Sequence, residues 1–319
     1  MNAITQTQKR KGFDALRGIG IAGIVLYHLF PNACKGGFLG VPLFFVLSGY
    51  LMFVTSQASW ERGDFHIRNY YKKRIRKIVP PLFTMVMGVC CFLTLTHSSL
   101  LTGIRQEVCS IFLGYENWWQ IGQKASYFTK LANASPFTHL WFLAVEIQFY
   151  LLWPILFFLY QKACKAIPGR KMCFVFLVLA LLSASRMFLL HIPDGDPSRV
   201  YYGTDTMAFP LLIGIFLGAI RQQYKQLCFT IEKCKACLLF FFFVLTIGIL
   251  FFTVDGQNNF LYQGGMFLLS LFFAAMINLI ANQEASIGRF LDTSLLSLLG
   301  KKSYGIYLWH YPIIILALI

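Results

Sequence analysis

Long apolar runs alternate with short polar or basic segments along the whole chain. Several runs approach or exceed the roughly 17 to 20 residues that a helix needs to cross about 30 Å of hydrocarbon. Glycine, proline and charged residues separate the runs into helices predicted near residues 15–31, 40–55, 79–97, 139–160, 172–191, 206–220, 236–254, 260–281 and 303–319. The pattern predicts an all-α, polytopic transmembrane bundle with about nine crossings and a single membrane domain over residues 1–319.

The composition excludes an ordinary soluble protein. Of the 319 residues, 57% are hydrophobic and 13% are charged, and the mean hydropathy is +0.61. Soluble domains usually carry roughly 25% charged residues. The first apolar run, which follows Lys9, Arg10 and Lys11, leads to Pro31 without a small-residue cleavage site, so it is predicted to remain in the membrane.

The distribution of basic residues predicts how the chain is threaded. The chain has 28 Lys and Arg against 13 Asp and Glu, which in a membrane protein reports orientation rather than a nucleic-acid partner. Most of the basic residues fall on one side if the N-terminus is cytoplasmic. That side holds Lys9, Arg10 and Lys11; Arg62, Arg68, Lys72, Lys73, Arg74, Arg76 and Lys77; Lys162, Lys165, Arg170 and Lys171; Arg221, Lys225, Lys233 and Lys235; and Arg289, Lys301 and Lys302.

Two predicted outer segments differ from simple connections. Residues 98–138 are long and moderately apolar, which favours an outer loop with a re-entrant or interfacial helix over a pair of extra crossings. The segment from His191 to Asp205 also carries Asp194 and Asp196. These carboxylates either face a polar substrate or are simply solvated.

Ionisable side chains inside a membrane helix are costly and therefore mark candidate functional sites. Arg17 and Arg186 fall within predicted helices. Arg17 and His28 are eleven residues apart, which places them within 20° of one helix face and about 16 Å apart along the axis. Asp14 can meet Arg17 one turn away. The alternative is an arginine that reaches inward and a histidine that closes the outer helix end.

Two further predicted helices carry ionisable groups. His139 and Glu146 are seven residues apart and again share a face, with Glu146 among apolar neighbours. A carboxyl group there needs a partner, either for chemistry or for a structural hydrogen bond between helices. His310 lies within the last predicted helix among aromatic residues, and a membrane-interface aromatic belt does not explain a histidine at mid-span.

Residues 68–77 form a strongly basic segment of the inner loop that is predicted between the second and third helices. Anionic lipid headgroups attract such a segment by about 1 kcal/mol per cation, and a phosphate-bearing cytosolic donor fits it as well. Cys234 and Cys237 form a lone C-x-x-C pair, which is weak evidence for a metal site or a redox site; the alternative is a pair of membrane-interface thiols beside Lys233 and Lys235. The sequence lacks a Walker loop, a dinucleotide glycine motif and a metal-spaced histidine pair.

Four ordered motifs resemble the acyltransferase-3 family of membrane O-acyltransferases. They are Phe13-Asp14-Ala15-Leu16-Arg17-Gly18 with Tyr27-His28; Gly37-Phe38-Leu39-Gly40-Val41 with Phe44-Phe45-Val46-Leu47-Ser48-Gly49-Tyr50; His139-Leu140-Trp141-Phe142-Leu143-Ala144-Val145-Glu146 with Gln148-Phe149-Tyr150-Leu151-Leu152-Trp153-Pro154; and Ser303-Tyr304-Gly305-Ile306-Tyr307-Leu308-Trp309-His310. The family's inner Arg-x-x-Arg becomes Arg74-Ile75-Arg76-Lys77 in this chain, so Lys77 replaces the second arginine or the register shifts. The family domain usually has ten crossings, so the final helix is expected to be missing from this chain.

The resemblance implies transfer of an acetyl or other short acyl group from cytosolic acyl-CoA to a hydroxyl of a surface polysaccharide or lipid-linked sugar, without a metal, in the bacterial cytoplasmic membrane. It also implies three groups of site residues with different roles. Catalysis is assigned to Asp14, His28, Glu146 and His310; donor binding to Arg17, Lys73, Arg74, Arg76 and Lys77; and acceptor binding to Ser48, Asn117, His139 and Trp309. Within this scheme His28 is the expected general base, and Glu146 or His310 orients it or relays the proton.

Direct transfer and an acyl-enzyme route both remain open at this point. A second class of function is a proton-coupled transporter or flippase of a glycan precursor, in which the buried Arg17, His28, Glu146 and His310 form a proton relay. Such a transporter would be expected to contain inverted repeats, and none is evident in the sequence. A third is an inactive membrane scaffold descended from the enzyme. The sequence does not specify the acyl group, the acceptor or the oligomeric state.

Overall fold

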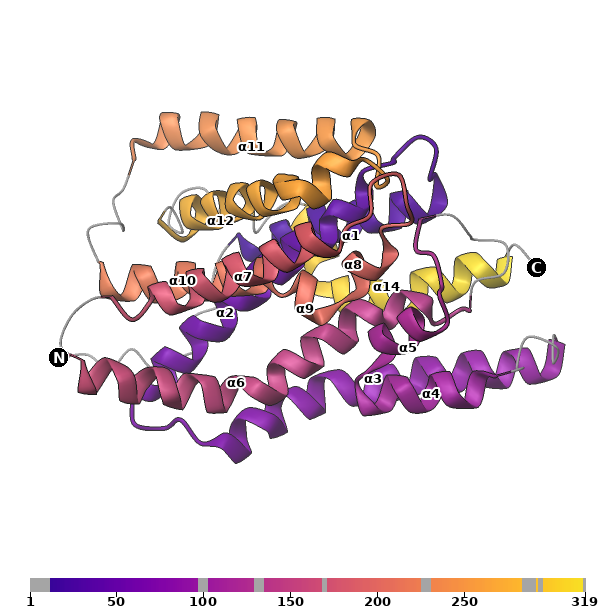
Figure 1. The fold of residues 1–319 in the computed structure, drawn as a ribbon, viewed down its shortest axis with the longest axis horizontal. Helices are drawn as coiled ribbons and strands as arrows, with labels where there is room; N and C mark the ends of the chain where they lie inside the picture. Colours follow the sequence, from indigo (N-terminus) through magenta and orange to yellow (C-terminus); the bar gives the residue numbers. More distant parts are fainter. Residues whose placement is uncertain are drawn as a thin grey trace.

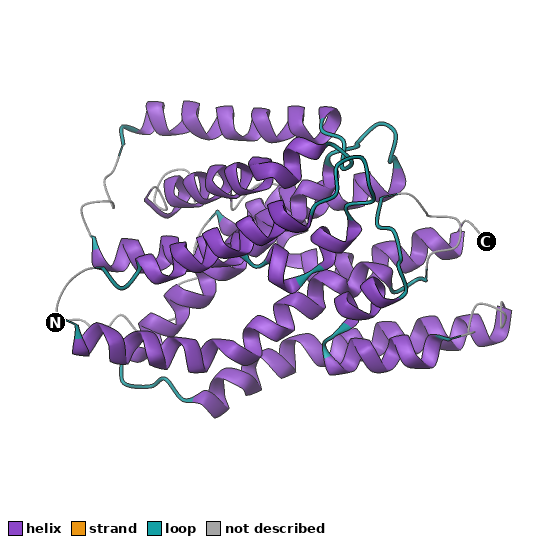
Figure 2. Ribbon diagram, in the orientation of Figure 1, coloured by secondary structure: helices purple, strands orange, loops and turns teal. Residues whose placement is uncertain are grey.

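The computed structural model describes residues 12–96, 103–128, 135–167, 171–224, 231–282, 291 and 295–317, and every regular element among them is a helix. Figure 1 shows the longer helices running side by side across the molecule, and Figure 2 shows short loops at their ends. Several basic residues used for the topology lie outside the described residues: Lys9, Arg10, Lys11, Arg170, Lys225 and Arg289.

Each predicted apolar helix is present in the structure. They are α1 (Phe13–Leu29), α2 (Gly40–Glu61), α3 (Ile67–Thr96), α6 (Trp141–Ala166), α7 (Phe174–Leu190), α10 (Phe209–Gln223), α11 (Lys233–Thr253), α12 (Met266–Asn282) and α14 (Leu295–Ala317). Among the described residues, six helical segments, containing α2, α3, α6, α10, α11 and α12, are long and apolar enough to cross a membrane, and α7 is a shorter apolar helix. The prediction of an all-α polytopic membrane bundle is confirmed.

The basic segment at residues 68–77 corrects one detail of the sequence-based threading. It was expected to be part of a loop, but it forms the first turns of α3, which is a continuous helix of 30 residues. Lysine and arginine are good helix formers, and no glycine or proline interrupts the sequence between Ile67 and Val79. The cations are therefore spaced by helical geometry, so only some of them share a face.

The segment at 98–138 contains short helices in its described part. These are α4 (Ile104–Leu113) and α5 (Glu116–Gly122), of ten and seven residues, and both are too short to cross a bilayer as a helix. Residues 98–102 and 129–134 lie outside the described part. Figure 1 shows α4 alongside the outer half of α3.

Other short elements complete the bundle at the ends of the long helices. They are η1 (Gly37–Leu39), η3 (Thr138–Leu140), α8 (Ser198–Tyr202), α9 (Thr204–Met207) and the π-helical turn η5 (Leu261–Gly265). The η3 turn leads directly into α6 and carries His139, so it positions that side chain at one end of the helix.

Helices α1 and α14 pack with their backbones in direct contact. A Cβ atom at Gly18 would lie 2.0 Å from the backbone oxygen of Leu296, and one at Gly300 would lie 1.6 Å from that of Asp14. Only glycine permits these two backbones to approach so closely. The contact fixes Asp14 and Arg17 of α1 against α14, and further along the same pair it brings His28 to His310.

Candidate active site

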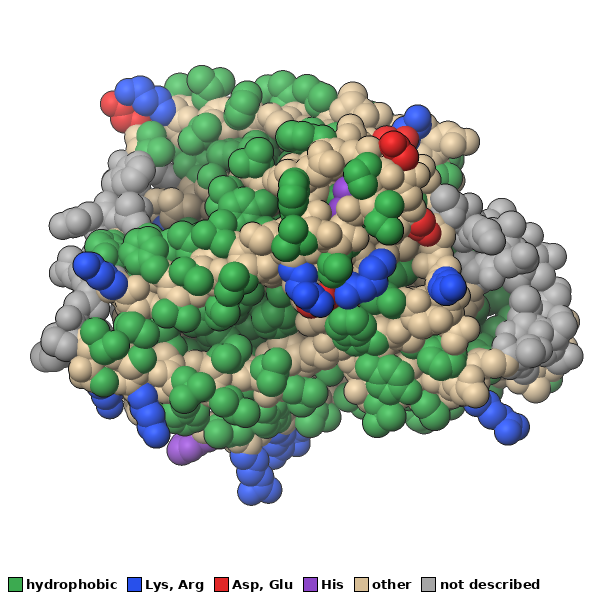
Figure 3. All heavy atoms as spheres, viewed as in Figure 1, with side chains coloured by type: hydrophobic (Ala, Val, Ile, Leu, Met, Phe, Trp, Pro, Cys, Tyr) green, Lys and Arg blue, Asp and Glu red, His purple; other side chains and the backbone are tan. Residues whose placement is uncertain are grey.

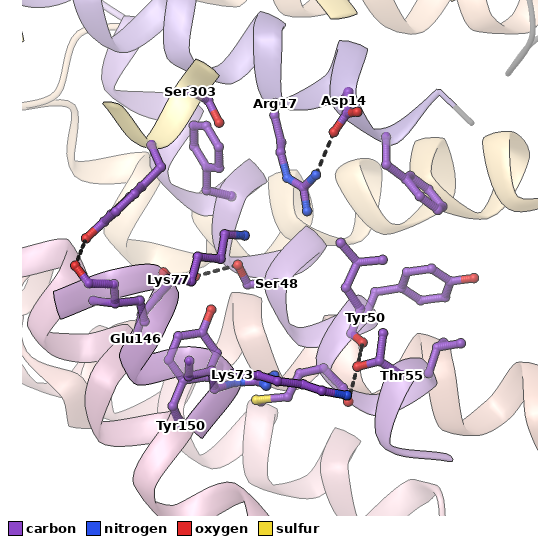
Figure 4. Close-up of a pocket in the computed structure, with 18 of the residues that line it drawn as sticks. Asp14, Arg17, Ser48, Tyr50, Thr55, Lys73, Lys77, Glu146, Tyr150 and Ser303 are labelled. Carbon is purple, nitrogen blue, oxygen red and sulfur yellow. Dashed lines mark hydrogen bonds and ion pairs between the residues drawn. The ribbon is translucent and has the colours of Figure 1, made fainter. Parts of the chain in front are cut away.

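A cavity of about 980 Å³ lies between α1, α2, α3, α6 and α14. Seven predicted site residues with polar side chains line it: Asp14, Arg17, Ser48, Lys73, Arg74, Lys77 and Glu146. Figure 4 shows the ends of Arg17 and Lys77 pointing into the same space from different helices. The cavity thus brings together residues that are far apart in the sequence, from Asp14 of α1 to Tyr307 of α14.

The two acidic side chains in the cavity have different partners. Arg17 donates to Asp14 over 2.7 Å, as the predicted spacing of three residues allows. The Ser48 hydroxyl donates to the Glu146 carboxyl group. Glu146 therefore joins α6 to α2 within the cavity, and its partner is a hydroxyl rather than a histidine.

Three cations of α3 line the cavity: Lys73, Arg74 and Lys77. The Arg74 guanidinium lies between two aromatic rings, 3.9 Å from the centroid of Tyr70 and 4.7 Å from that of Tyr150. Such stacking holds a guanidinium in place without neutralising it. Arg76 does not line the cavity and is exposed. The structure thus separates Arg76 from the other residues expected to bind the donor.

The cavity extends toward the ends of α2 and α10. Arg62 follows the last residue of α2, and Arg221 lies in the last turn of α10. The neighbouring residues join the two helix ends, because the Gln222 amide donates to the Glu61 carboxylate. Both ends lie on the side that the basic residues predict to be cytoplasmic.

Two aromatic side chains close the opposite end of the cavity. Phe142 and Tyr307 line it with their ring centroids 5.6 Å apart. Tyr307 also contacts the residues behind it, because its hydroxyl donates to the backbone oxygen of His139 over 2.6 Å. We call this pair the aromatic wall.

Three histidines lie together on the other side of the aromatic wall. His28, His139 and His310 are 7%, 3% and 8% exposed, and none of them lines the cavity. The ring centroid of His310 lies 5.1 Å from that of His28 and 5.4 Å from that of His139. Tyr311 packs against His28 and His139 at 4.9 and 5.1 Å. We call these three histidines the histidine cluster.

The hydrogen bonds of His28 and His310 indicate which ring nitrogen carries the proton when both of these imidazoles are neutral. His310 Nδ1 lies 2.8 Å from the carbonyl oxygen of Tyr307, so it must carry the proton and donate. His310 Nε2 is then an acceptor, and it lies 3.3 Å from His28 Nδ1. His28 Nδ1 also lies 2.9 Å from the Ile24 carbonyl oxygen, so it carries the proton of His28. This assignment leaves the lone pair of His28 on Nε2.

The remaining predicted acceptor residues occupy separate places. Asn117 donates to the Tyr202 carbonyl oxygen and to Thr204, and accepts from Gln148 over 2.9 Å. Trp309 is 38% exposed and lies against Gly88 of α3. Ser48 belongs to the cavity and His139 to the histidine cluster. The structure therefore does not gather the four residues into one pocket.

Several residues of the site were not identified from the sequence. Tyr307 is one helical turn from His310, so the spacing of three residues could have placed it on the same face. Tyr70 is one helical turn from Arg74, but this spacing gave no signal while the segment was not predicted to be helical. Tyr150 gave no usable signal because it comes from a different helix. Tyr127 lies 6.2 Å from His28 by ring centroids, in a segment whose path the hydrophobic pattern did not define.

Among the residues that the structure describes, neither the histidine cluster nor the cysteines form a metal-binding group. Within the described ranges, no group of three or more His, Cys, Asp and Glu side chains is arranged to hold a metal ion. Cys234 and Cys237 are free and exposed. The contacts of the histidine cluster are therefore hydrogen bonds and ring packing.

Comparison with known proteins places this chain in a family. The acyltransferase-3 family model, described as an acyltransferase domain, matches residues 10–317. The Bacillus subtilis protein YrhL, named as a peptidoglycan O-acetyltransferase, is 36% identical over 311 residues, which cover 96% of this chain and 49% of YrhL. The peptidoglycan O-acetyltransferase OatA of Listeria monocytogenes is 35% identical over 306 residues, covering 95% of this chain and 49% of OatA.

A third relative gives the same result. The O-acetyltransferase OatA of Staphylococcus aureus is 33% identical over 309 residues, which cover 95% of this chain and 50% of that protein. The chain thus spans about half the length of these relatives, and no solved structure matches it. Because the family match extends over nearly the whole sequence, the chain belongs to the acyltransferase-3 family of membrane acyltransferases.

Proposed function

We propose that the chain transfers an acetyl group from acetyl-CoA on the cytoplasmic side to a hydroxyl of peptidoglycan on the outer side of the bacterial cytoplasmic membrane. The relative from Listeria monocytogenes is named for this modification of peptidoglycan. One structural observation carries the proposal: a cation-lined cavity and a histidine cluster lie on opposite sides of the same aromatic wall. This arrangement separates a phosphate-binding region from a region suited to proton transfer.

The cavity suits a long donor with phosphates at one end. The cavity is lined along α2 and its C-terminal end by Ser48, Leu51, Thr55, Ser59 and Arg62. The distance from Ser48 to Arg62, fourteen positions further along, is about 21 Å at the helical rise. Lys73, Arg74 and Lys77 supply charges and guanidinium donors for the diphosphate of CoA. The pantetheine arm then extends along α2 toward Glu146 and the aromatic wall.

The histidine cluster supplies the base. His28 Nε2 takes the proton of the acceptor hydroxyl while the hydroxyl oxygen attacks the carbonyl carbon of the thioester. The carbon–sulfur bond breaks, and the departing sulfur of CoA takes up the proton from His28. During the step the charged His28 keeps its Nδ1 proton directed at His310 Nε2, which accepts it over 3.3 Å. His310 thus acts as a positioning residue for His28.

The thioester reaches this base only if the aromatic wall opens. Phe142 and Tyr307 stand between the cavity and the histidine cluster, so direct transfer requires one or both side chains to move aside. We favour direct transfer because His28 and His310 already form a base with its partner. The N-terminus is cytoplasmic in this scheme, as the basic residues predict.

Acyl transfer in sealed proteoliposomes tests the proposal. Radiolabelled acetyl-CoA is supplied on the predicted cytoplasmic side and a peptidoglycan fragment on the other, and the label in the glycan is counted. We expect label in the glycan with the wild type and a loss of at least about 100-fold in His28→Ala. His66→Ala is the matched control, because His66 is exposed and does not line the cavity. Equal labelling by a correctly inserted His28→Ala variant would overturn the proposal.

A further inference from the structure

Two arginines outside the cavity and the histidine cluster lie on an apolar outer face of the bundle. The Arg186 side chain is 58% exposed and the Arg199 side chain 36% exposed. Arg186 belongs to α7, where Leu182 and Leu189 are 62% and 77% exposed. Figure 3 shows a group of basic and acidic atoms surrounded by hydrophobic side chains on this face. The proposed acyl transfer does not use these arginines.

Both arginines share one carboxylate. Arg186 donates from Nε to Asp205 over 2.6 Å. Arg199 donates to both oxygens of the same carboxylate over 3.2 and 3.1 Å. Two cations thus face one anion, which leaves a net positive charge. The two terminal nitrogens of Arg186 have no partner among the residues that the structure describes.

The surroundings hold Arg199 in place. Its guanidinium lies 5.3 Å from the ring centroid of Trp118, a residue that is itself 39% exposed. A Cβ atom at Gly203 would lie 2.3 Å from an Arg199 nitrogen, so the glycine leaves room for the guanidinium. Ser183 donates to the Asp205 backbone oxygen over 2.9 Å and ties this turn to α7. The arginines are therefore presented from a fixed framework.

The position of Arg186 along α7 indicates its depth in the membrane. Arg186 precedes the end of α7 at Leu190 by four residues, which is about 6 Å along the axis. In the predicted topology this end is the outer one, so the arginines lie near the outer boundary of the hydrocarbon. Lipid phosphates lie at this boundary, and tryptophan is enriched there. An uncompensated cation facing lipid is costly, whereas a phosphate removes that cost.

We propose that Arg186, Arg199 and Trp118 form a binding site for the phosphate of a membrane lipid. Arginine binds phosphate with two parallel hydrogen bonds, and the terminal nitrogens of Arg186 are available for them. The phosphate belongs either to a bilayer phospholipid or to an isoprenoid diphosphate that carries a sugar. Both sources share the same chemistry at the arginines.

The site is connected to the histidine cluster through aromatic contacts. Tyr202 follows Arg199 by one turn in α8, and its ring centroid lies 5.9 Å from that of Tyr127. Tyr127 in turn lies 6.2 Å from His28. A sugar on an isoprenoid diphosphate held at the arginines would thus lie on the side of the bundle that leads to His28. The phospholipid source would instead anchor this part of α7 to the bilayer.

Lipid binding to the purified chain tests the site without depending on catalysis. The chain is placed in phosphatidylcholine nanodiscs, and retention of two probes, phosphatidylglycerol and a polyprenyl diphosphate, is measured by native mass spectrometry. We expect Arg186→Gln to weaken binding of at least one probe about tenfold. Arg105→Gln is the matched control, because Arg105 is an exposed arginine of α4 on the same predicted side.

The two probes distinguish the two sources of phosphate. A loss confined to the polyprenyl diphosphate supports a lipid-linked sugar, and a loss confined to phosphatidylglycerol supports a bilayer lipid. Wild-type binding of both probes by a folded Arg186→Gln variant would overturn the proposal, as would an equal loss in Arg105→Gln. Because the Arg186 side chain is 58% exposed, its replacement should leave the fold intact, and a melting curve checks this.

Discussion

The cavity and the histidine cluster differ in how they use polar side chains. The cavity contains cations from α1, α3, α10 and the end of α2 together with two carboxyl groups, and it extends to the end of the bundle. The histidine cluster consists of three imidazoles that are almost completely buried, and the phenol ring of Tyr311 packs against two of them. Tyr307 of the aromatic wall borders both environments, because it lines the cavity and its ring centroid lies 5.2 Å from that of His139.

This difference shows how a membrane protein can bind a highly charged donor and still perform proton transfer nearby. Fixed cations attract phosphate but would repel a charged imidazolium if they lay beside it. The wall and the distance along α1, about 16 Å from Arg17 to His28 at the helical rise, keep the two apart. Substitutions in each region should therefore separate effects on donor binding from effects on the chemical step.

The largest effect is expected from the histidine cluster. Replacing His28 with alanine removes the proposed base, so kcat should fall about 10³-fold while the affinity for acetyl-CoA changes little. The measurement is kcat from initial rates together with donor binding by isothermal titration calorimetry. A fall in donor affinity that accounts for the loss of rate would place His28 in the donor site. It would contradict the separation of the donor-binding cavity from the histidine cluster.

Replacing His310 with phenylalanine should have the next largest effect. The variant keeps a ring between α14 and α1 but removes the acceptor for His28 Nδ1, so kcat should fall about 30-fold with an unchanged KM for the donor. Steady-state kinetics of His310→Phe and of Trp309→Phe, a neighbouring residue outside the cluster, measure this effect. An increase in KM without a loss of kcat would assign His310 to donor binding instead.

The placement of Arg17 and Glu146 in a different region from His28 and His139 could be predicted from the sequence. On α1 the charged Arg17 precedes His28, and in the third motif Glu146 is about two turns deeper than His139. The helical period placed each pair on one face, and the direction of threading placed both charged residues toward the inside. In the structure Arg17 and Glu146 line the cavity, and His28 and His139 belong to the histidine cluster.

The cavity cations are expected to act mainly on donor binding. Arg74→Gln and Lys77→Gln should each raise the KM for acetyl-CoA about tenfold with less than about a threefold change in kcat, because phosphate contacts form before the reaction. Arg76→Gln is the matched control on the same helix and should change KM less than about twofold, since Arg76 does not line the cavity. Donor titrations of the three variants would contradict this assignment if Arg76→Gln had the largest effect.

The segment from Arg74 to Lys77 shows what the sequence pattern left undecided. The motif left open whether Arg76 or Lys77 corresponds to the second arginine of the family pattern. Because the segment is helical, Arg74 and Lys77 are one turn apart and share a face, whereas Arg76 points elsewhere. The expectation of a loop removed the periodicity that would have decided the question.

The aromatic wall and the partners of Asn117 could not be predicted for a different reason. Each depends on contacts between helices that are far apart in the sequence, such as Phe142 with Tyr307 and Asn117 with Gln148 and Thr204. A hydrophobic pattern specifies which face of a helix is buried, but it does not specify the neighbour that covers this face. The resemblance to a family indicated the residues and not their arrangement.

The smallest expected effect concerns two buried carboxyl groups in the outer region. Glu107 of α4 accepts from Ser135 over 2.6 Å, and the Gln120 amide donates to Glu116 over 2.5 Å and to Glu107 over 3.2 Å. Both helices lie outside the six spans identified by length and hydropathy. Burial raises the pKa of Glu116 from 4.5 to about 8, with a further contribution from repulsion by Glu107, whose pKa burial also raises.

The proton on Glu116 determines whether the stability of the fold rises or falls with pH. Between about pH 4.5 and 8 the folded chain retains a proton on Glu116 that the unfolded chain releases, so stability should decrease as pH rises through this range. Glu116→Gln cannot ionise, and its melting temperature at about pH 8.5 should exceed that of the wild type by about 3 °C or more. Glu232→Gln, a variant of an exposed glutamate, should follow the wild type. The opposite outcome is that the melting temperatures of Glu116→Gln and the wild type change with pH in the same way from about pH 5 to 9. The outer region would then tolerate a buried charge, and its contrast with the charged cavity would be weaker than the structure indicates.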